Sequence, residues 1–347
     1  MILGIESSCD DTSCAVLKNK LILSNVTANQ SIHRQYGGVI PELASRDHEK
    51  NMIPVIDAAL KNAKVNLSEL SAIAVTRGPG LSGSLLVGLS TAKSLSLALG
   101  IPLIEVNHMQ GHILAHFIRE TKHGNDGAKS ENATSDTAPS FPFLCLTVSG
   151  GHTQIVKVTA PLEFELLAET EDDAVGEAFD KAAKILGLPY PGGPLIDKYA
   201  QSGDASKYKF PTPRLANYNY SFSGVKTAFL YFIQEQTGLN PDFVQEHLPD
   251  ICASYQAHLI NYLLKNLLAV AKETGIRHIA IAGGVSANSG LRATLQELGR
   301  KHQWHTYIPK FEYCTDNAAM IAMTGYFKFL EKEFCGLDAV PLARYSL

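Results

Sequence analysis

Two histidines at helical spacing are the strongest candidates for metal chemistry in this sequence. His108 and His112 lie in residues 107–116, directly after the apolar run 101–106, which predicts a buried strand. If the chain becomes helical here, residues four apart share one face and lie about 5.4 Å apart along the axis. Two imidazoles at that separation can bind one ion, although two histidines on a helix surface would show the same spacing.

A third ligand decides between these interpretations. The pair resembles the His-Glu-x-x-His pattern of zinc metalloproteases, but Met109 stands where the catalytic Glu would be, so peptide hydrolysis lacks its general base. His116, one turn further on, is one candidate ligand. Asp316 is the other, because it opens an apolar helix of small residues, where a carboxylate suits the positive end. Two His and one carboxylate are typical of Fe(II), and zinc also accepts them.

A polar turn between two predicted strands carries the next candidate side chains. Residues 1–6 and 14–17 predict strands, and the turn between them contains Asp10 and Asp11 among Ser and Thr residues. Adjacent carboxylates with hydroxyl donors would suit a phosphate group with a cation. An ordinary hydrophilic turn has a similar composition.

The same strand–turn–strand pattern returns later in the chain. Residues 143–148 and 154–158 predict strands, and Gly150 and Gly151 lie in the turn between them. Glycines let backbone N–H groups approach an anion closely, although a plain glycine turn is the alternative. The repetition predicts a duplicated α/β fold in which each half presents a hairpin to a shared cleft.

Several helix starts carry further candidates. Residues 36–48 lead into a helix with Glu42, Arg46 and His48, for which a plain helix surface is the alternative. Residues 172–187 predict a helix with an acidic first turn, followed by a Pro/Gly loop and a second helix. Strand 278–282, a glycine pair and a helix then form a pattern that can hold a nucleotide, which is weak by itself.

Basic and aromatic side chains interleave over residues 207–226. This stretch contains Lys207, Lys209, Arg214 and Lys226 among Tyr and Phe residues, a composition that can bind RNA, although a solvated loop is an equal alternative. The net charge of −4 excludes a global attraction to nucleic acid. Any such partner must therefore be held by a local patch or with help from other proteins.

Length and composition place the chain among two-domain cytoplasmic proteins. At 347 residues with 45% hydrophobic content it can bury two cores, and its 6 cysteines form no Cys-x-x-Cys pair, as expected of reduced cytosolic residues. No signal peptide, organellar presequence or membrane span is expected. Residues 121–140 contain no large apolar residue and predict a flexible surface insertion. The expected division is a lobe over 1–118, the insertion over 119–141 and a second lobe over 142–347, whose last helical region may return to the first lobe.

Seven motifs, in order from residue 1 to about 325, resemble those of the TsaD family, once described as glycoproteases. They are residues 2–12 (ILGIESSCDDT), 36–46 (YGGVIPELASR), 108–112 (HMQGH), 149–153 (SGGHT), 176–181 (GEAFDK), 283–288 (GGVSAN) and 315–317 (TDN). Bacterial members usually have Asp-Glu-Thr at the hairpin tip, whereas this chain has Asp10-Asp11-Thr12, one methylene shorter.

The resemblance implies a fold, a reaction and a set of site residues. The implied fold is α/β, a duplicated actin- and hexokinase-like fold of two lobes around a nucleotide cleft. The implied reaction transfers a threonylcarbamoyl group from threonylcarbamoyl-AMP to the exocyclic amine of adenosine 37 in tRNAs that read codons beginning with A. His108, His112 and Asp316 become the ligands of one Fe2+ ion, with zinc as the alternative, and Asp10 and Asp11 become the catalytic pair. The implied adenylate-binding residues are Val148, Ser149, Gly150, Gly151, His152, Thr153, Asp180, Gly193, Asp197 and Asn288.

The resemblance also implies partners. Bacterial relatives work with TsaB and TsaE, and with TsaC as the upstream synthase, whereas mitochondrial relatives act as a homodimer; no membrane partner is expected. Two alternatives from other classes are a metallo-glycopeptidase, disfavoured by Met109, and an ATPase or phosphotransferase of the same fold. A catalytically idle subunit is disfavoured by the complete set of three metal ligands.

Overall fold

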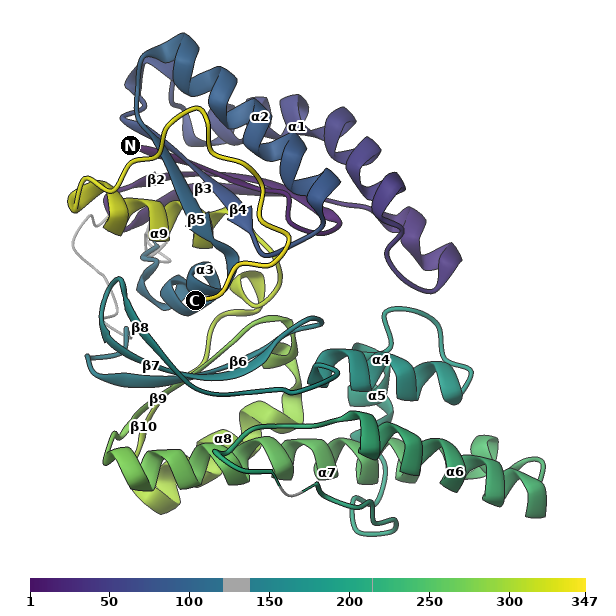
Figure 1. The fold of residues 1–347 in the computed structure, drawn as a ribbon. Coiled ribbons are helices and arrows are strands. Elements are labelled where there is room, and N and C mark those ends of the chain that lie inside the picture. The colour runs from purple at the N-terminus through teal and green to yellow at the C-terminus, as the bar shows by residue number, and fades with distance from the viewer. Residues whose placement is uncertain (121–137, 214) are drawn as a thin grey trace, which may run out of the picture. The chain divides into compact units, whose positions relative to one another are not determined.

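The chain forms two compact units in the computed structural model, which describes residues 1–120, 138–213 and 215–347 (Figure 1). The first unit comprises Met1–Ala138 with Pro309–Leu347, and the second comprises Pro139–Ile308. Residues 121–137 of the expected insertion lie outside the described residues. Whereas the sequence-based division placed 142–347 in the second lobe with its last helical region as a possible exception, Pro309–Leu347 pack with the first unit.

The first unit is built on a five-stranded sheet with the order β3-β2-β1-β4-β5. Strands β1, β2 and β3 are antiparallel neighbours, whereas β1, β4 and β5 run parallel. The predicted N-terminal hairpin is therefore present as β1 and β2. The bounds are β1 Ile2–Glu6, β2 Asp11–Lys18, β3 Leu21–Asn29, β4 Ala72–Gly78 and β5 Leu103–Asn107.

Helices cover both faces of this sheet, α1 Pro41–Ala63 and α2 Ser82–Leu99 on one face and α3 His108–Leu114 and α9 Ala318–Leu330 on the other (Figure 1). The alternation of a strand explains the arrangement. Leu3 and Ile5 of β1 join the core beneath α1 and α2. Gly4 points the other way, and a Cβ there would lie 2.4 Å from the Ala318 carbonyl oxygen. The small residues of α9 thus let the helix lie directly on the centre of the sheet.

The second unit repeats this topology with the order β10-β9-β6-β7-β8. Its first strand is again central, pairing antiparallel with the next strand and parallel with a later one. The predicted duplication of the α/β fold is confirmed. The bounds are β6 Phe143–Val148, β7 Thr153–Ala160, β8 Glu163–Glu169, β9 His278–Ala282 and β10 His305–Tyr307.

One core joins the second sheet to its helices, the longest of which is α7. The predicted helix over 172–187 begins at Val175 instead, because the Asp172 carboxylate accepts the N–H groups of Phe222 and Ser223 at the start of α6 (2.7 and 3.3 Å). None of the described helices combines the length and apolar character needed to span a bilayer. The bounds are α4 Val175–Ile185, α5 Gly193–Ala200, α6 Ser223–Leu239, α7 Phe243–Thr274 and α8 Ser289–His302.

Candidate metal centre

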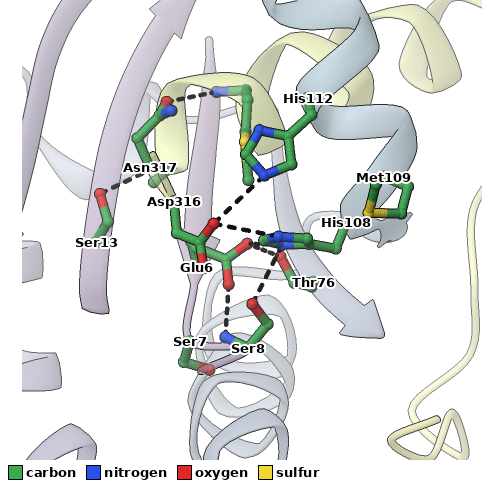
Figure 2. Close-up of polar contacts among 12 residues, drawn as sticks. Glu6, Ser7, Ser8, Ser13, Thr76, His108, Met109, His112, Asp316 and Asn317 are labelled. Carbon is green, nitrogen blue, oxygen red and sulfur yellow. Dashed lines mark hydrogen bonds and ion pairs between the residues drawn. The ribbon is translucent and has the colours of Figure 1, made fainter. Parts of the chain in front are cut away.

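Two helix starts in the first unit bring three potential metal ligands together. The chain leaves β5 and turns helical at His108, so His108 and His112 lie one turn apart on α3. Asp316 comes two residues before α9, where the side chain of Asn317 caps the helix by accepting the Met320 N–H at 3.0 Å. One ligand atom from each of the three residues lies within 4.8 Å of the others (Figure 2).

The donor atoms fit a metal ion. The Nε2 atoms of His108 and His112 each lie 3.3 Å from the same Asp316 oxygen, Oδ1. Both nitrogens of His112 are buried without a hydrogen bond from any described residue, although Nε2 is within ion-pair distance of Asp316. A buried imidazole nitrogen without a partner is costly, and a cation bound by all three residues would give His112 Nε2 a partner. His116, the other candidate from the sequence, is not a member of this group.

The charges at the site differ between the two histidines. Burial lowers the pKa of His112, which keeps its ring neutral. Burial acts in the same direction on His108, but the carboxylates of Asp316 and Glu6 outweigh it and raise the pKa of His108 well above its ordinary value. Burial opposes ionisation of Asp316, yet the contact with His108 lowers the pKa of Asp316 strongly. The carboxylate is therefore ionised and available to a cation.

Glu6 was not singled out from the sequence, but it contacts the metal ligands directly. Its carboxylate is fully buried at the end of β1 and lies 3.0 Å from His108 Nδ1. Thr76 Oγ1 donates to the same Glu6 oxygen at 2.6 Å (Figure 2). The available signal was a charged residue at the end of an otherwise apolar strand, which is unusual enough to mark a site.

The hairpin tip with Asp10 and Asp11 is held by two helices. The Nε2–H of His48 on α1 donates to the Cys9 carbonyl at 3.0 Å, so its Nδ1 accepts from the Thr12 hydroxyl at 2.7 Å. Ser84 on α2 also donates to the Cys9 carbonyl, at 3.0 Å. His48 is thus a buried clamp on this turn, whereas its sequence neighbours Glu42 and Arg46 form an exposed ion pair at 2.7 Å.

Burial alters the acidity of Asp11 at the hairpin tip. It begins β2 and accepts a hydrogen bond from Asn29 at 2.6 Å. Burial, reinforced by the carboxylates of Asp10, Asp316 and Glu6, outweighs that bond and raises the pKa of Asp11 to about 7. A carboxyl group with this pKa can exchange a proton near neutral pH.

The residues expected to bind adenylate lie in the second unit, and four of them belong to two separate hydrogen-bonded groups. Asp180 on α4 accepts the N–H groups of Gly192 and Gly193 at 2.8 and 3.1 Å. Asp197 on α5 accepts from the hydroxyl and N–H of Ser289 at 2.7 and 3.0 Å. Gln256 then connects Asp197 to Asn288, which also caps α8.

The turn of the β6–β7 hairpin, residues 149–152, shows which glycines are required by packing. A Cβ at Gly176 would lie 2.5 Å from the Ser149 carbonyl oxygen, so α4 approaches the turn too closely for a side chain. At Gly150 and Gly151 a Cβ would meet no described atom within 4 Å, and both are exposed. Val148 is buried beneath the turn, and Thr153 accepts the Val175 N–H at 2.9 Å. Packing therefore leaves the glycine pair unexplained.

The basic and aromatic stretch over residues 207–226 is partly used by the fold. Lys207 pairs with Asp250, and Lys226 pairs with Asp173, both at 2.7 Å. The aromatic residues Phe210, Tyr220 and Phe222 belong to the core of the second unit and are at most 9% exposed. Lys209 is exposed, and Arg214 lies outside the described residues. The rings of these three residues are therefore not available for stacking on bases.

The sequence of the chain is similar to those of known proteins over nearly its whole length. A family model described as TsaD, tRNA N6-adenosine threonylcarbamoyltransferase, matches residues 21–323. The protein of that name from Christiangramia forsetii is 59% identical over 345 residues, covering 99% of this chain and 98% of the relative. The protein of the same name from Porphyromonas gingivalis is 52% identical over 347 residues, covering 100% and 98%.

Solved structures resemble the chain in fold. The HypF crystal structure from T. kodakarensis aligns with a TM-score of 0.61 at 13% identity, covering 96% of this chain and 47% of HypF. A second HypF structure aligns with a TM-score of 0.58 at 13% identity, covering 95% of this chain and 46% of that chain. At these identities the likeness concerns the fold alone.

Proposed function

The chain belongs to the TsaD family, and we propose that it transfers the threonylcarbamoyl group from threonylcarbamoyl-AMP to the exocyclic amine of adenosine 37 in tRNAs that read codons beginning with A, releasing AMP. Its fold is the expected α/β, duplicated actin- and hexokinase-like fold. The observation that carries the proposal is the meeting of His108, His112 and Asp316 at one point in a chain that matches transferases of that name over its full length.

The three ligands suit one Fe2+ ion per chain, with zinc as the alternative. Two imidazoles and one carboxylate with an open side are the donor set of non-haem iron sites, and zinc accepts the same groups. Asp316 is partly exposed, with 27% of its side chain accessible, so a substrate oxygen has room to approach. When bound, the ion would orient the donor and polarise its carbonyl oxygen.

The reaction needs orientation more than a covalent nucleophile, because the donor is already activated. The adenosine amine forms the new N–C bond, the bond from the carbamoyl carbon to the phosphate oxygen breaks, and AMP leaves with that electron pair. The amine must also lose a proton. Asp11, with a pKa of about 7, is the hairpin residue suited to accept it, and Asp10 beside it adds negative charge.

The second unit supplies groups for the AMP part of the donor. Gly150 and Gly151 are exposed, and without side chains they let backbone N–H groups approach an anion closely. Ser149 adds a hydroxyl, and the buried Thr153 holds the end of the turn against α4. Ser149 already accepts the His152 N–H at 3.0 Å, which shapes the turn. We assign Asp180, Gly193, Asp197 and Asn288, which form the two bonded groups described above, to the nucleoside.

A tRNA substrate is implied by the family, and the other partners are proposals. We expect TsaB and TsaE to assist in a bacterial cytoplasm, with TsaC supplying the adenylate, or a homodimer in an organelle. The metallo-glycopeptidase alternative is not favoured, because Met109, which follows His108 on α3, stands at the sequence position where that chemistry needs a Glu.

Reconstitution tests the proposal. The protein, its partners, threonine, bicarbonate, ATP and an unmodified tRNA are incubated, and the nucleosides are identified by mass spectrometry. Threonylcarbamoyladenosine should form. Its absence with every partner verified as active would contradict the function, whereas its formation at the normal rate by Asp316→Ala would contradict only the metal mechanism.

A further inference from the structure

Glu6 is a buried carboxylate that the reaction described above does not use. It is the last residue of β1, and none of its surface is exposed. A carboxylate without water is costly unless its oxygens are bonded. The Ser8 N–H donates to Oε1 at 2.5 Å, and the Thr76 hydroxyl donates to Oε2 at 2.6 Å. The remaining partner is His108 Nδ1, 3.0 Å from Oε2.

The sheet delivers these groups to one another. Strands β1 and β4 are parallel neighbours in which Ile5 pairs with Val75, so Glu6 and Thr76 follow side by side at the same edge. Thr76 can donate its only hydroxyl proton to Glu6, which fixes the position of Oε2. His108 approaches that oxygen from the start of α3 (Figure 2).

The two nitrogens of His108 face different carboxylates. Nδ1 faces Glu6 and Nε2 faces Asp316. Since a carboxylate only accepts, Nδ1 carries a proton toward Glu6, and the Ser8 hydroxyl lies 3.2 Å from the same nitrogen. With a cation bound in place of the proton on Nε2, the ring would be neutral and would have its lone pair on Nε2. His112 differs, because its Nδ1 has no hydrogen bond from any described residue. Both rings face Asp316 through Nε2, but only His108 has a carboxylate on its Nδ1 side among the described residues.

We propose that Glu6 is a positioning residue of the metal centre, which holds the His108 ring with Nδ1 protonated and Nε2 directed at the ion. This inference rests on the metal site proposed above. A hydrogen-bonded carboxylate behind a histidine ligand fixes the ring and raises its basicity, and removing such a partner typically weakens metal binding by about 10–100-fold. Thr76 acts one step further out by holding Glu6.

Zinc binding to the purified, metal-depleted protein tests the proposal without any assay of activity. Affinities are measured by competition with a chromophoric chelator, for the wild type, Glu6→Gln and Thr76→Val. Glu6→Gln should weaken zinc binding by about 10–100-fold. Thr76→Val should weaken zinc binding less, because the carboxylate of Glu6 remains. Glu105→Gln is the matched control, because Glu105 is partly buried in the same sheet but pairs with Arg77 at 2.6 Å, and its zinc affinity should be unchanged.

A spectroscopic measurement separates positioning from general damage. In the diamagnetic zinc-loaded protein, 15N NMR should show a protected Nδ1–H on His108, and this signal should be lost in Glu6→Gln. The thermal midpoint of each metal-free variant shows whether it is folded, and Thr76→Val serves if Glu6→Gln does not fold.

Two results would overturn the inference in distinguishable ways. Equal zinc affinity in Glu6→Gln and the wild type, with His112→Ala clearly weaker, would leave the metal centre intact and remove the role of Glu6. Equal affinity in the wild type and His112→Ala would reject the metal centre itself, and the role of Glu6 with it.

Discussion

The side-chain amide of Asn107 donates hydrogen bonds to the main-chain carbonyls of Tyr345 and Ser346, at 3.2 and 3.0 Å. The oxygen of the same amide accepts the Met109 and Gln110 N–H groups and so begins α3. One buried residue thus connects the C-terminal segment to the helix that carries the metal histidines.

Asn107→Asp should separate the two functions of this amide. Aspartate still caps a helix, but it cannot donate to the carbonyls and places a negative charge beside them. We expect the free energy of unfolding to fall by about 1–3 kcal/mol, measured by urea denaturation. Asn107→Ser keeps an acceptor without the charge and should cost less. Equal stability of Asn107→Asp and the wild type would show that the contact with Tyr345 and Ser346 contributes nothing.

The metal ligands can be tested by occupancy. The purified protein should carry about one ion per chain, and the double variant His108→Ala, His112→Ala should lose it, as measured by elemental analysis. His116→Ala should retain the ion, because His116 is outside the group of ligand atoms. Full occupancy in the double variant, or loss in His116→Ala, would show that the ligands are assigned incorrectly.

The raised pKa of Asp11 predicts a pH dependence of stability. With a folded-state pKa of about 7 and an ordinary unfolded value, the folded state binds more protons between these two values. The stabilising contribution is therefore complete below the unfolded pKa and is lost as the pH rises through about 7. Asp11→Asn should remove this fall. As the pH rises from about 5 to about 8, the free energy of unfolding of the metal-free variant should therefore increase relative to that of the wild type.

Urea denaturation across that range measures the effect. Asp57→Asn is the control, because Asp57 lies on α1 with 57% of its side chain exposed. A constant stability difference between Asp11→Asn and the wild type would contradict the raised pKa.

The glycines beside the second hairpin should differ in their response to substitution. Gly150→Ala meets no described atom and should leave the melting temperature unchanged, but a methyl group there should hinder an anion and weaken AMP binding, measured by calorimetry. Gly176→Ala places a Cβ 2.5 Å from the Ser149 carbonyl oxygen and should lower the free energy of unfolding by about 1–3 kcal/mol. Unchanged AMP affinity in Gly150→Ala would exclude this turn as the phosphate site.

A contribution of Lys209 to tRNA binding can be measured by charge reversal. Lys209 is exposed, whereas Lys207 and Lys226 are held by Asp250 and Asp173. Lys209→Glu should weaken tRNA binding and lower the dependence of log affinity on log salt by about one unit, while AMP affinity stays constant. Lys301→Glu at the end of α8 has the same change of net charge and should have a smaller effect. If both charge reversals weakened tRNA binding equally, the effect would come from net charge and not from a specific contact of Lys209.

Local features of the chain were predicted well because they depend on neighbouring residues. Apolar runs bounded by glycine and polar residues located β6 and β9, and the four-residue spacing of His108 and His112 fixed their shared helix face. The edge strands β3, β8 and β10 and the helix α6 were not predicted. The edge strand β8 is largely exposed, so its sequence carries little apolar periodicity.

Contacts between distant segments were decided by the tertiary structure. From the residues alone, His116 and Asp316 were equal candidates for the third ligand; only the family resemblance favoured Asp316. Asp316 reaches the histidines of α3 because α9, which begins two residues later, packs directly on Gly4 of β1. The interleaved rings at 207–226 suggested an RNA surface, but Tyr220 and Phe222 became core residues. The sequence by itself determined the central strands, many of the helices and the paired histidines, because a helix or strand repeats at a fixed short period, and its motifs indicated the family. Asp316 and Glu6 face opposite nitrogens of His108 only because β1, α3 and the residues before α9 pack together. Residues so far apart in the chain are brought together by tertiary contacts, which no local period of the sequence encodes.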